Sequence, residues 1–95
     1  MSTDKENTKY FTIVNSGYVK GYDCGEAIVN YGLFTNREDA IRECRNHFQK
    51  EIDNFKDHLV LFSIRPIPGG GMNIEYKSHD GKTCITRWFV NEIVK

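Results

Sequence analysis

The sequence has no surplus of charge of either sign and no long hydrophobic run. Lysine and arginine total 13 and aspartate and glutamate total 13, so the formal net charge is zero. A neutral chain lacks the long-range positive field that draws proteins onto nucleic acid, and equally the negative field of a DNA mimic. We therefore place nucleic acid below protein as the expected partner.

The N-terminus contains no apolar stretch of the kind that a signal peptide or a membrane span requires. Residues 1–9 are polar and mixed in charge, and we expect them to form a flexible tail. Residues 10–95 then form a single domain, because a chain of this length has room for one core. These features predict a cytoplasmic protein with no membrane partner.

Cysteines are few, and their arrangement excludes the usual cysteine frameworks. Cys24, Cys44 and Cys84 are odd in number and widely spaced, which fits neither paired disulfides nor Cys-x-x-Cys metal knuckles. Cys44 and His47 lie one helical turn apart and could present two zinc ligands. Cys44, however, falls in an apolar stripe, where a free cysteine acts as a small hydrophobe. We expect no metal and no cofactor.

The first half of the chain predicts two strands and one long helix. Residues 10–15 form an aromatic and β-branched strand that we expect to end at Ser16-Gly17. Glycines at 17, 21 and 25 indicate turns or bulges before a possible short strand at 27–31. Thr35 and Glu38 have the spacing of a capping box, and Glu38 can pair with Arg42. The apolar stripe of the following helix, about 20 residues long, contains Ala40, Ile41, Cys44, Phe48, Ile52 and Phe55.

The second half of the chain predicts three antiparallel strands. Residues 58–65 are apolar on both faces until Pro66, which predicts a central strand. Residues 72–77 alternate apolar and polar side chains, and Asp80-Gly81 favours a type I′ hairpin turn. The returning strand, 82–90, places Cys84, Thr86, Trp88 and Val90 on one face and Thr83, Ile85, Arg87 and Phe89 on the other.

The predicted fold class is α+β, an antiparallel sheet of four to five strands with one long covering helix in ββαβββ order. One helix, about 10 Å across, shields only about two strands. Because several strands carry apolar residues on both faces, we hypothesise that the uncovered sheet face docks a partner or a second copy of the chain, as a homodimer. The alternative is that the glycine-rich loop and the tail fold over this face.

The sequence carries no catalytic signature. No pair of carboxylates lies in an apolar setting that would separate their pKa values, and the glycine-rich segments match no phosphate-loop pattern. We expect a protein that is not an enzyme.

The expected function is that of a small protein-binding module. Asn, Lys, Tyr and Phe are plentiful, as in accessory proteins of phages and mobile elements, some of which inhibit or modulate a host protein such as a defence nuclease. The expected partner is therefore a host or cognate protein. Tyr, Trp and Arg are common interface anchors, and the candidate binding residues are Tyr18, Lys20, Tyr22, Arg65, Lys82, Arg87, Trp88 and Phe89.

Single-stranded nucleic-acid binding is the alternative function. Lys20-Gly21-Tyr22 resembles the opening of an RNA-recognition-motif signature, although Asp23 and Cys24 depart from it. A local basic cluster adds to this alternative: Arg65, Lys77, Lys82 and Arg87.

Overall fold

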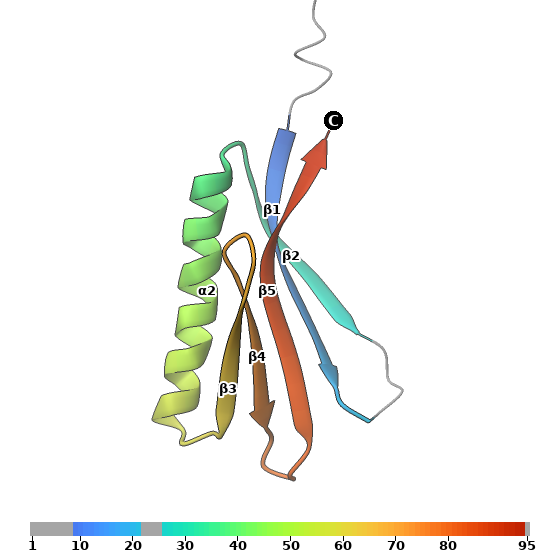
Figure 1. Cartoon of the computed structure of the whole chain (residues 1–95), viewed down its shortest axis with the longest axis vertical. Helices are drawn as coiled ribbons and strands as arrows, with labels where there is room; N and C mark the ends of the chain where they lie inside the picture. The colour runs from blue at the N-terminus through green and yellow to red at the C-terminus, as the bar shows by residue number, and fades with distance from the viewer. Residues whose placement is uncertain (1–8, 22–25, 95) are drawn as a thin grey trace, which may run out of the picture.

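The structure, a computed structural model, describes residues 9–21 and 26–94 and has the predicted α+β architecture. A five-stranded antiparallel sheet packs against one helix in the order β-β-α-β-β-β (Figure 1). The elements are β1 (Lys9–Val19), β2 (Ala27–Phe34), α2 (Arg37–Asp57), β3 (Phe62–Ile67), β4 (Gly71–Lys77) and β5 (Thr83–Val94). Of the predicted tail, residues 1–8 lie outside the described residues and Lys9 begins β1.

The two strands at the ends of the chain lie in the middle of the sheet. The strand order is β2-β1-β5-β4-β3, and every neighbouring pair is antiparallel. β1 and β5 pair along their whole length, from Lys9 opposite Val94 to Val19 opposite Cys84. This long central ladder leaves β2 and β3 as the two edges of the sheet.

β1 continues past the point where the sequence predicted its end. Ser16 pairs with Ile28 on β2 and with Arg87 on β5, and Gly17 pairs with residues of the same two strands. Because β1 has a hydrogen-bonded neighbour on both sides, the ladders hold Gly17 in an extended conformation that its weak strand propensity does not favour. Gly21, with a φ of 84°, is in the turn that follows.

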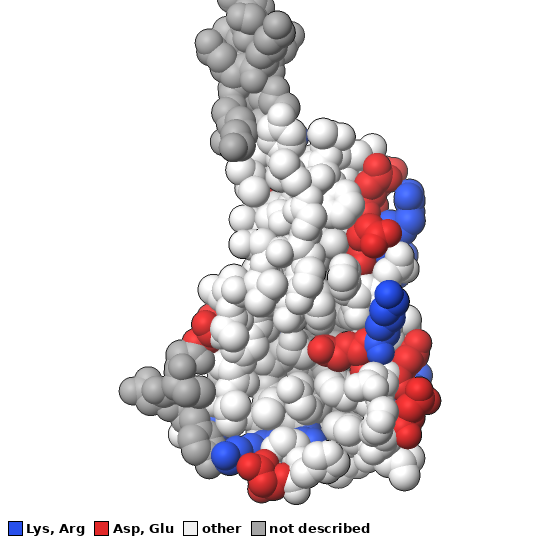
Figure 2. Space-filling view, turned by 180° about the vertical axis from the view of Figure 1, so that it is seen from behind, with Lys and Arg blue, Asp and Glu red and all other residues white. Residues whose placement is uncertain are grey.

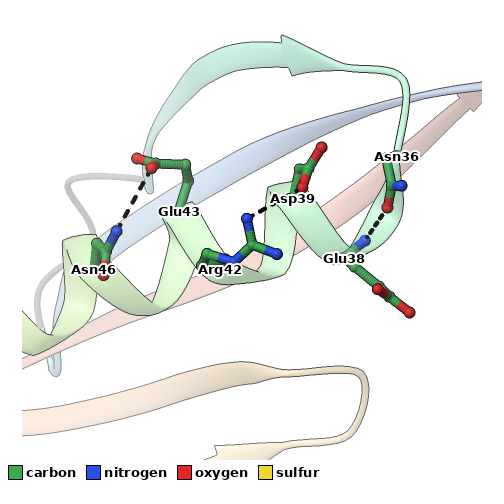
Figure 3. A network of polar contacts seen from close by, with 6 residues as sticks. All are labelled: Asn36, Glu38, Asp39, Arg42, Glu43 and Asn46. Atoms are coloured by element: carbon green, nitrogen blue, oxygen red, sulfur yellow. Dashed lines mark hydrogen bonds and ion pairs between the residues drawn. The ribbon is translucent and has the colours of Figure 1, made fainter.

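The helix begins one residue later than predicted, with Asn36 as its N-cap. The Asn36 side-chain oxygen accepts a hydrogen bond of 2.7 Å from the backbone nitrogen of Glu38 (Figure 3). The predicted Glu38–Arg42 pair is also wrong, because Arg42 instead pairs with Asp39 at 3.2 Å. Asn is at least as good a cap as Thr, which explains why the local sequence allows this shift.

The predicted apolar stripe of the helix forms one side of the core. Its fully or nearly buried residues are Ala40, Cys44, Phe48, Ile52 and Phe55. They pack against side chains from the inner strands of the sheet, chiefly Ile13 on β1, Ile74 on β4 and Trp88 on β5. The helix therefore covers the face of the sheet to which these three residues belong.

The predicted central strand at 58–65 is wrong, because β3 begins only at Phe62 and lies at the sheet edge. Leu59 follows the helix with a φ of 55°. The Leu59 backbone nitrogen donates to the Lys56 carbonyl oxygen, and the Val60 backbone nitrogen donates to the Phe55 carbonyl oxygen. This Schellman-type end uses residues that the apolar pattern assigned to a strand. Pro66 lies inside β3, where an edge strand tolerates a missing N–H donor.

The hairpin between β4 and β5 differs from the predicted type I′ turn. A type I′ turn needs a positive φ at both of its central residues. Here Gly81 has a φ of 82°, but Asp80 does not have a positive φ. The Gly81 nitrogen bonds to the Ser78 carbonyl oxygen at 3.0 Å, and the Ser78 nitrogen bonds to Lys82 at 2.9 Å. The connection is a turn closed by a left-handed glycine, as in hairpins with a bulge.

The face of the sheet opposite the helix has no covering helix or strand among residues 9–21 and 26–94. Thr12, Val14 and Ser16 point to this face but are buried, because β2 and β5 flank them on both sides. Over β3 and β4 the same face carries the polar side chains of Arg65, Asn73 and Glu75 beside Ile67. The alternative in which the tail and the glycine-rich loop cover the face concerns residues that lie largely outside the described part.

Candidate functional site

The predicted binding residues divide between several parts of the molecule. Tyr18, Arg65 and Arg87 together line a hollow of about 380 Å³ on the face opposite the helix. Lys20 is exposed just beyond β1, whereas Lys82 lies in the β4–β5 hairpin and pairs with Asp80 at 3.3 Å. Tyr22 lies outside the described residues. The structure therefore brings together three of the eight residues.

Trp88 and Phe89 point in opposite directions from β5. Trp88 is buried on the helix side, stacked on His47 with ring centroids 5.2 Å apart. The prediction that Trp88 is an exposed interface anchor is therefore wrong, because its indole faces the core. Phe89 is half-buried on the opposite face, next to Val14 in the ladder.

The hollow opposite the helix mixes charges of both signs. Arg65, Asn73 and Arg87 form one row across β3, β4 and β5. Glu75 lines the same hollow, and its carboxylate reduces the net positive charge that the two arginines give the hollow. Among the described residues, no ion pair joins either arginine to a carboxylate. The hollow offers two guanidinium groups and the ring of Tyr18.

β2 is an edge strand that neither a charged side chain nor a proline protects, and its one irregularity is a shift of register against β1 beside Gly32, whose φ is 73°. Among the strands that the structure describes, it pairs only with β1, and its sequence, AIVNYGLF, contains no charged residue and no proline. Ile28, Val29 and Leu33 are 62%, 46% and 63% exposed. The opposite edge, β3, carries Arg65 and Pro66, which hinder pairing with another strand. Within residues 9–21 and 26–94, β2 is therefore the edge that is unpaired, uncharged and apolar.

The charge distribution sets this strand apart from the helix. Figure 2 shows charged side chains gathered along the helix side of the molecule, while the broad surface beside them is largely uncharged. The missing charge on β2 was visible in the sequence. Its significance was not, because an edge strand cannot be told from an inner strand before the strand order is known.

A groove of about 540 Å³ opens on the helix side of the sheet, beyond the part that the helix covers. Gly17 and Ala27 lie opposite each other in the β1–β2 ladder, and their small size leaves this space open. The lining residues are Asn15, Gly17, Tyr18, Val19, Glu26, Ala27, Val29, Glu51, Tyr76, Cys84, Ile85 and Thr86. This site was not predicted, because its residues come from five separate elements.

Glu51 is the half-buried carboxylate of this groove. Its Oε1 accepts a hydrogen bond of 3.1 Å from Nε1 of Trp88. Burial raises the pKa of Glu51 above its ordinary value, and the Trp88 hydrogen bond partly offsets that shift by stabilising the charged form. Burial also raises the pKa of Tyr76, with further contributions from Cys84 and from Glu51.

Cys44, which the sequence pattern made a possible zinc ligand together with His47, is fully buried in the core. Burial raises the pKa of the Cys44 thiol to about 11, so this group stays protonated at neutral pH. His47 stacks on Trp88 and Tyr31. Residues 9–21 and 26–94 contain no group of three or more His, Cys, Asp or Glu side chains placed to hold a metal ion.

The helix α2 is amphipathic and charged on its outer side, and no helix in the described ranges has the length and apolar character needed to cross a membrane.

Comparison with protein-family models, with curated proteins and with solved structures finds no match.

Proposed function

We propose that this chain is a small, non-enzymatic protein-binding module that docks a partner protein through strand β2. The observation that carries the proposal is the edge of β2, which combines eight uncharged residues with three large, exposed apolar side chains. Soluble proteins usually protect such edges, so an open edge is suited to strand pairing with another protein.

Strand addition accounts for both the backbone and the side chains of β2. A partner strand would hydrogen-bond to the N–H and C=O groups that β1 does not use. Ile28 and Leu33 lie on the face away from the helix, and Val29 lies on the helix side beside the groove. The partner would therefore contact apolar groups on both sides of the added strand.

The identity of the partner rests on composition. A chain rich in Asn, Lys, Tyr and Phe matches the character of phage and mobile-element accessory proteins. We propose a cytoplasmic host protein, such as a defence nuclease, whose activity this module inhibits or modulates by covering a surface.

The first experiment is a tagged pull-down from lysate of a bacterial host, with and without nuclease treatment, read by mass spectrometry. Binding of the captured protein is then measured with both components purified. Ile28→Lys and Leu33→Lys place a charge on the open edge, and we expect each to weaken binding at least about tenfold. Leu61→Lys is the matched control, since Leu61 is 76% exposed next to the opposite edge.

Equal binding by the β2 variants and the native chain would reject docking through this strand. Sedimentation of the purified chain tests the homodimer. A dimer that Ile28→Lys dissociates would assign β2 to self-association and would replace the partner-protein proposal.

Single-stranded nucleic-acid binding is the second candidate, favoured by Tyr18, Arg65 and Arg87 lining one hollow. This function predicts that affinity for a labelled oligonucleotide falls steeply with salt and weakens in Arg87→Ala. Arg45→Ala, on the exposed side of the helix, is the control. Binding that is insensitive to salt, or equally weakened in both variants, would reject this candidate.

A further inference from the structure

The described residues give the groove on the helix side of the sheet negative charge and no cation in its lining. Glu26 and Glu51 both line it, and none of its twelve lining residues is Lys, Arg or His. Among the described residues, Glu51 takes part in no ion pair. A half-buried carboxylate without a counter-charge is costly, so a cationic ligand would gain from entering this groove.

We propose that this groove receives the cationic head of an arginine or lysine side chain from the partner protein. The inference rests on the proposed protein-binding function and names a second point of contact next to β2. Val29 joins the two surfaces, because it belongs to the open edge strand and also lines the groove.

The lining offers a place for both parts of such a side chain. Val19, Ala27 and Val29 form an apolar wall along which an aliphatic stem can lie. Of the two Glu51 oxygens, Oε1 is engaged by Trp88, and Oε2 accepts no hydrogen bond within the described part of the chain. The charged head can therefore donate to Glu51 without displacing the indole.

Asn15 provides a second polar contact at the groove. Its side-chain nitrogen donates to Thr86 Oγ1 at 2.8 Å and to the Arg87 carbonyl oxygen at 3.1 Å. Both bonds fix the amide plane and engage its donor side, which leaves the Asn15 carbonyl oxygen as an acceptor. Donor-only groups such as ammonium and guanidinium match a site whose free groups are acceptors.

The hollow on the face opposite the helix fits this ligand less well. The hollow opposite the helix is lined by Arg65 and Arg87 as well as Glu75, so a cation there meets two like charges. The groove beside Glu51 has carboxylates alone. Its ligand class is therefore distinct from the nucleic-acid phosphates considered for the opposite face.

The test is an NMR titration of the full chain with three probes, N-acetyl-arginine amide, N-acetyl-lysine amide and N-acetyl-citrulline amide. Citrulline is the neutral isostere of arginine. We expect the charged probes to shift the backbone amides of Gly17, Ala27 and Thr86 and to change the fluorescence of Trp88, the single tryptophan. Citrulline should bind at least about tenfold more weakly, as expected for the loss of a charge-assisted hydrogen bond.

Glu51→Gln is the decisive variant, because glutamine keeps an acceptor for the Trp88 indole and removes the charge. We expect it to weaken binding of the arginine and lysine probes at least about tenfold. Glu43→Gln removes a charge from the exposed side of the same helix and should bind like the native chain. Circular dichroism of both variants checks that the fold is retained.

Three results would overturn the inference: no binding of the charged probes, equal binding of citrulline, or full binding by Glu51→Gln. The β2 experiment separates this outcome from failure of the proposed function. If Ile28→Lys abolishes partner binding while the probes do not bind, the function stands and the groove is rejected. If the probes bind through Glu51 but no protein partner is found, the groove stands and the proposed function fails.

Discussion

Nε1 of Trp88 donates a hydrogen bond to Oε1 of Glu51 over 3.1 Å, joining the middle of β5 to the middle of α2. Trp88 is buried and stacks on His47, so its N–H needs a partner inside the protein. Glu51 supplies that partner and at the same time carries its charge into the groove. One contact therefore serves both the core and the candidate binding site.

Glu51→Gln should stabilise the folded chain at neutral pH. Because burial raises the folded-state pKa of Glu51 above 4.5, the folded state favours the protonated form more than the unfolded state does. The stability that this preference for the protonated carboxyl contributes is fully present below the pKa of Glu51 in the unfolded state. It is lost as the pH rises through the pKa of Glu51 in the folded state. Urea unfolding at pH 7 should show a higher free energy of unfolding for the variant, and unfolding below pH 4.5 should show a smaller difference. A larger gain in the free energy of unfolding at acid pH than at pH 7 would contradict a raised pKa for Glu51.

Ile74→Ala should destabilise the fold by about 2–5 kcal/mol, because the Ile74 side chain is fully buried between the sheet and the helix. Ile64 lies directly opposite Ile74 in the β3–β4 ladder but is 48% exposed. Ile64→Ala is therefore the matched control, with an expected cost below about 1 kcal/mol. Chemical denaturation of both variants measures these costs, and equal values would place the core elsewhere.

Asn36→Ala should lower the free energy of unfolding by about 1 kcal/mol, because it removes the acceptor for the Glu38 backbone nitrogen. Thr35→Ala tests the cap position that the sequence pattern had indicated. Thr35 is exposed, and its removal should have little effect. Thermal unfolding followed by circular dichroism compares the two variants, and a larger loss for Thr35→Ala would move the cap back to Thr35.

Cys44 should resist alkylation in the folded protein. Its thiol is fully buried, and a pKa of about 11 leaves almost no thiolate at neutral pH. Treatment with iodoacetamide at pH 7, followed by peptide mass spectrometry, should leave Cys44 unmodified until a denaturant is added. Cys84, half-buried at the groove, is the internal comparison and should react first. Modification of Cys44 at the rate of Cys84 would show that the core opens readily.

Local sequence patterns predicted the elements that depend on near neighbours. The helix stripe of Phe48, Ile52 and Phe55 repeats at four- and three-residue intervals, and the same residues are buried. The alternation along β5 likewise placed Trp88 and Phe89 on opposite faces. The cap at Asn36 was missed by one residue because Thr35 and Asn36 are both good caps and only the geometry of the chain entry distinguishes them.

The candidate sites were harder to predict, because they depend on strand order. The apolar run 58–65 looked like an inner strand, yet its first residues end the helix and the remainder forms an edge. The groove was not predicted because Asn15, Glu51 and Thr86 are far apart in the sequence and none stands out from its neighbours. A single sequence contains no signal that pairs such residues.

The sequence by itself determined the class of fold, the order of its elements and which helix residues form the core, since these follow from periodicity and local turn chemistry. Tertiary structure alone decided that β1 and β5 lie in the centre, that β2 is an edge, and that Glu51 faces a groove to which the described residues bring no counter-charge. These features arise from contacts between residues distant in the chain, and such contacts leave no period in the sequence from which they could be read.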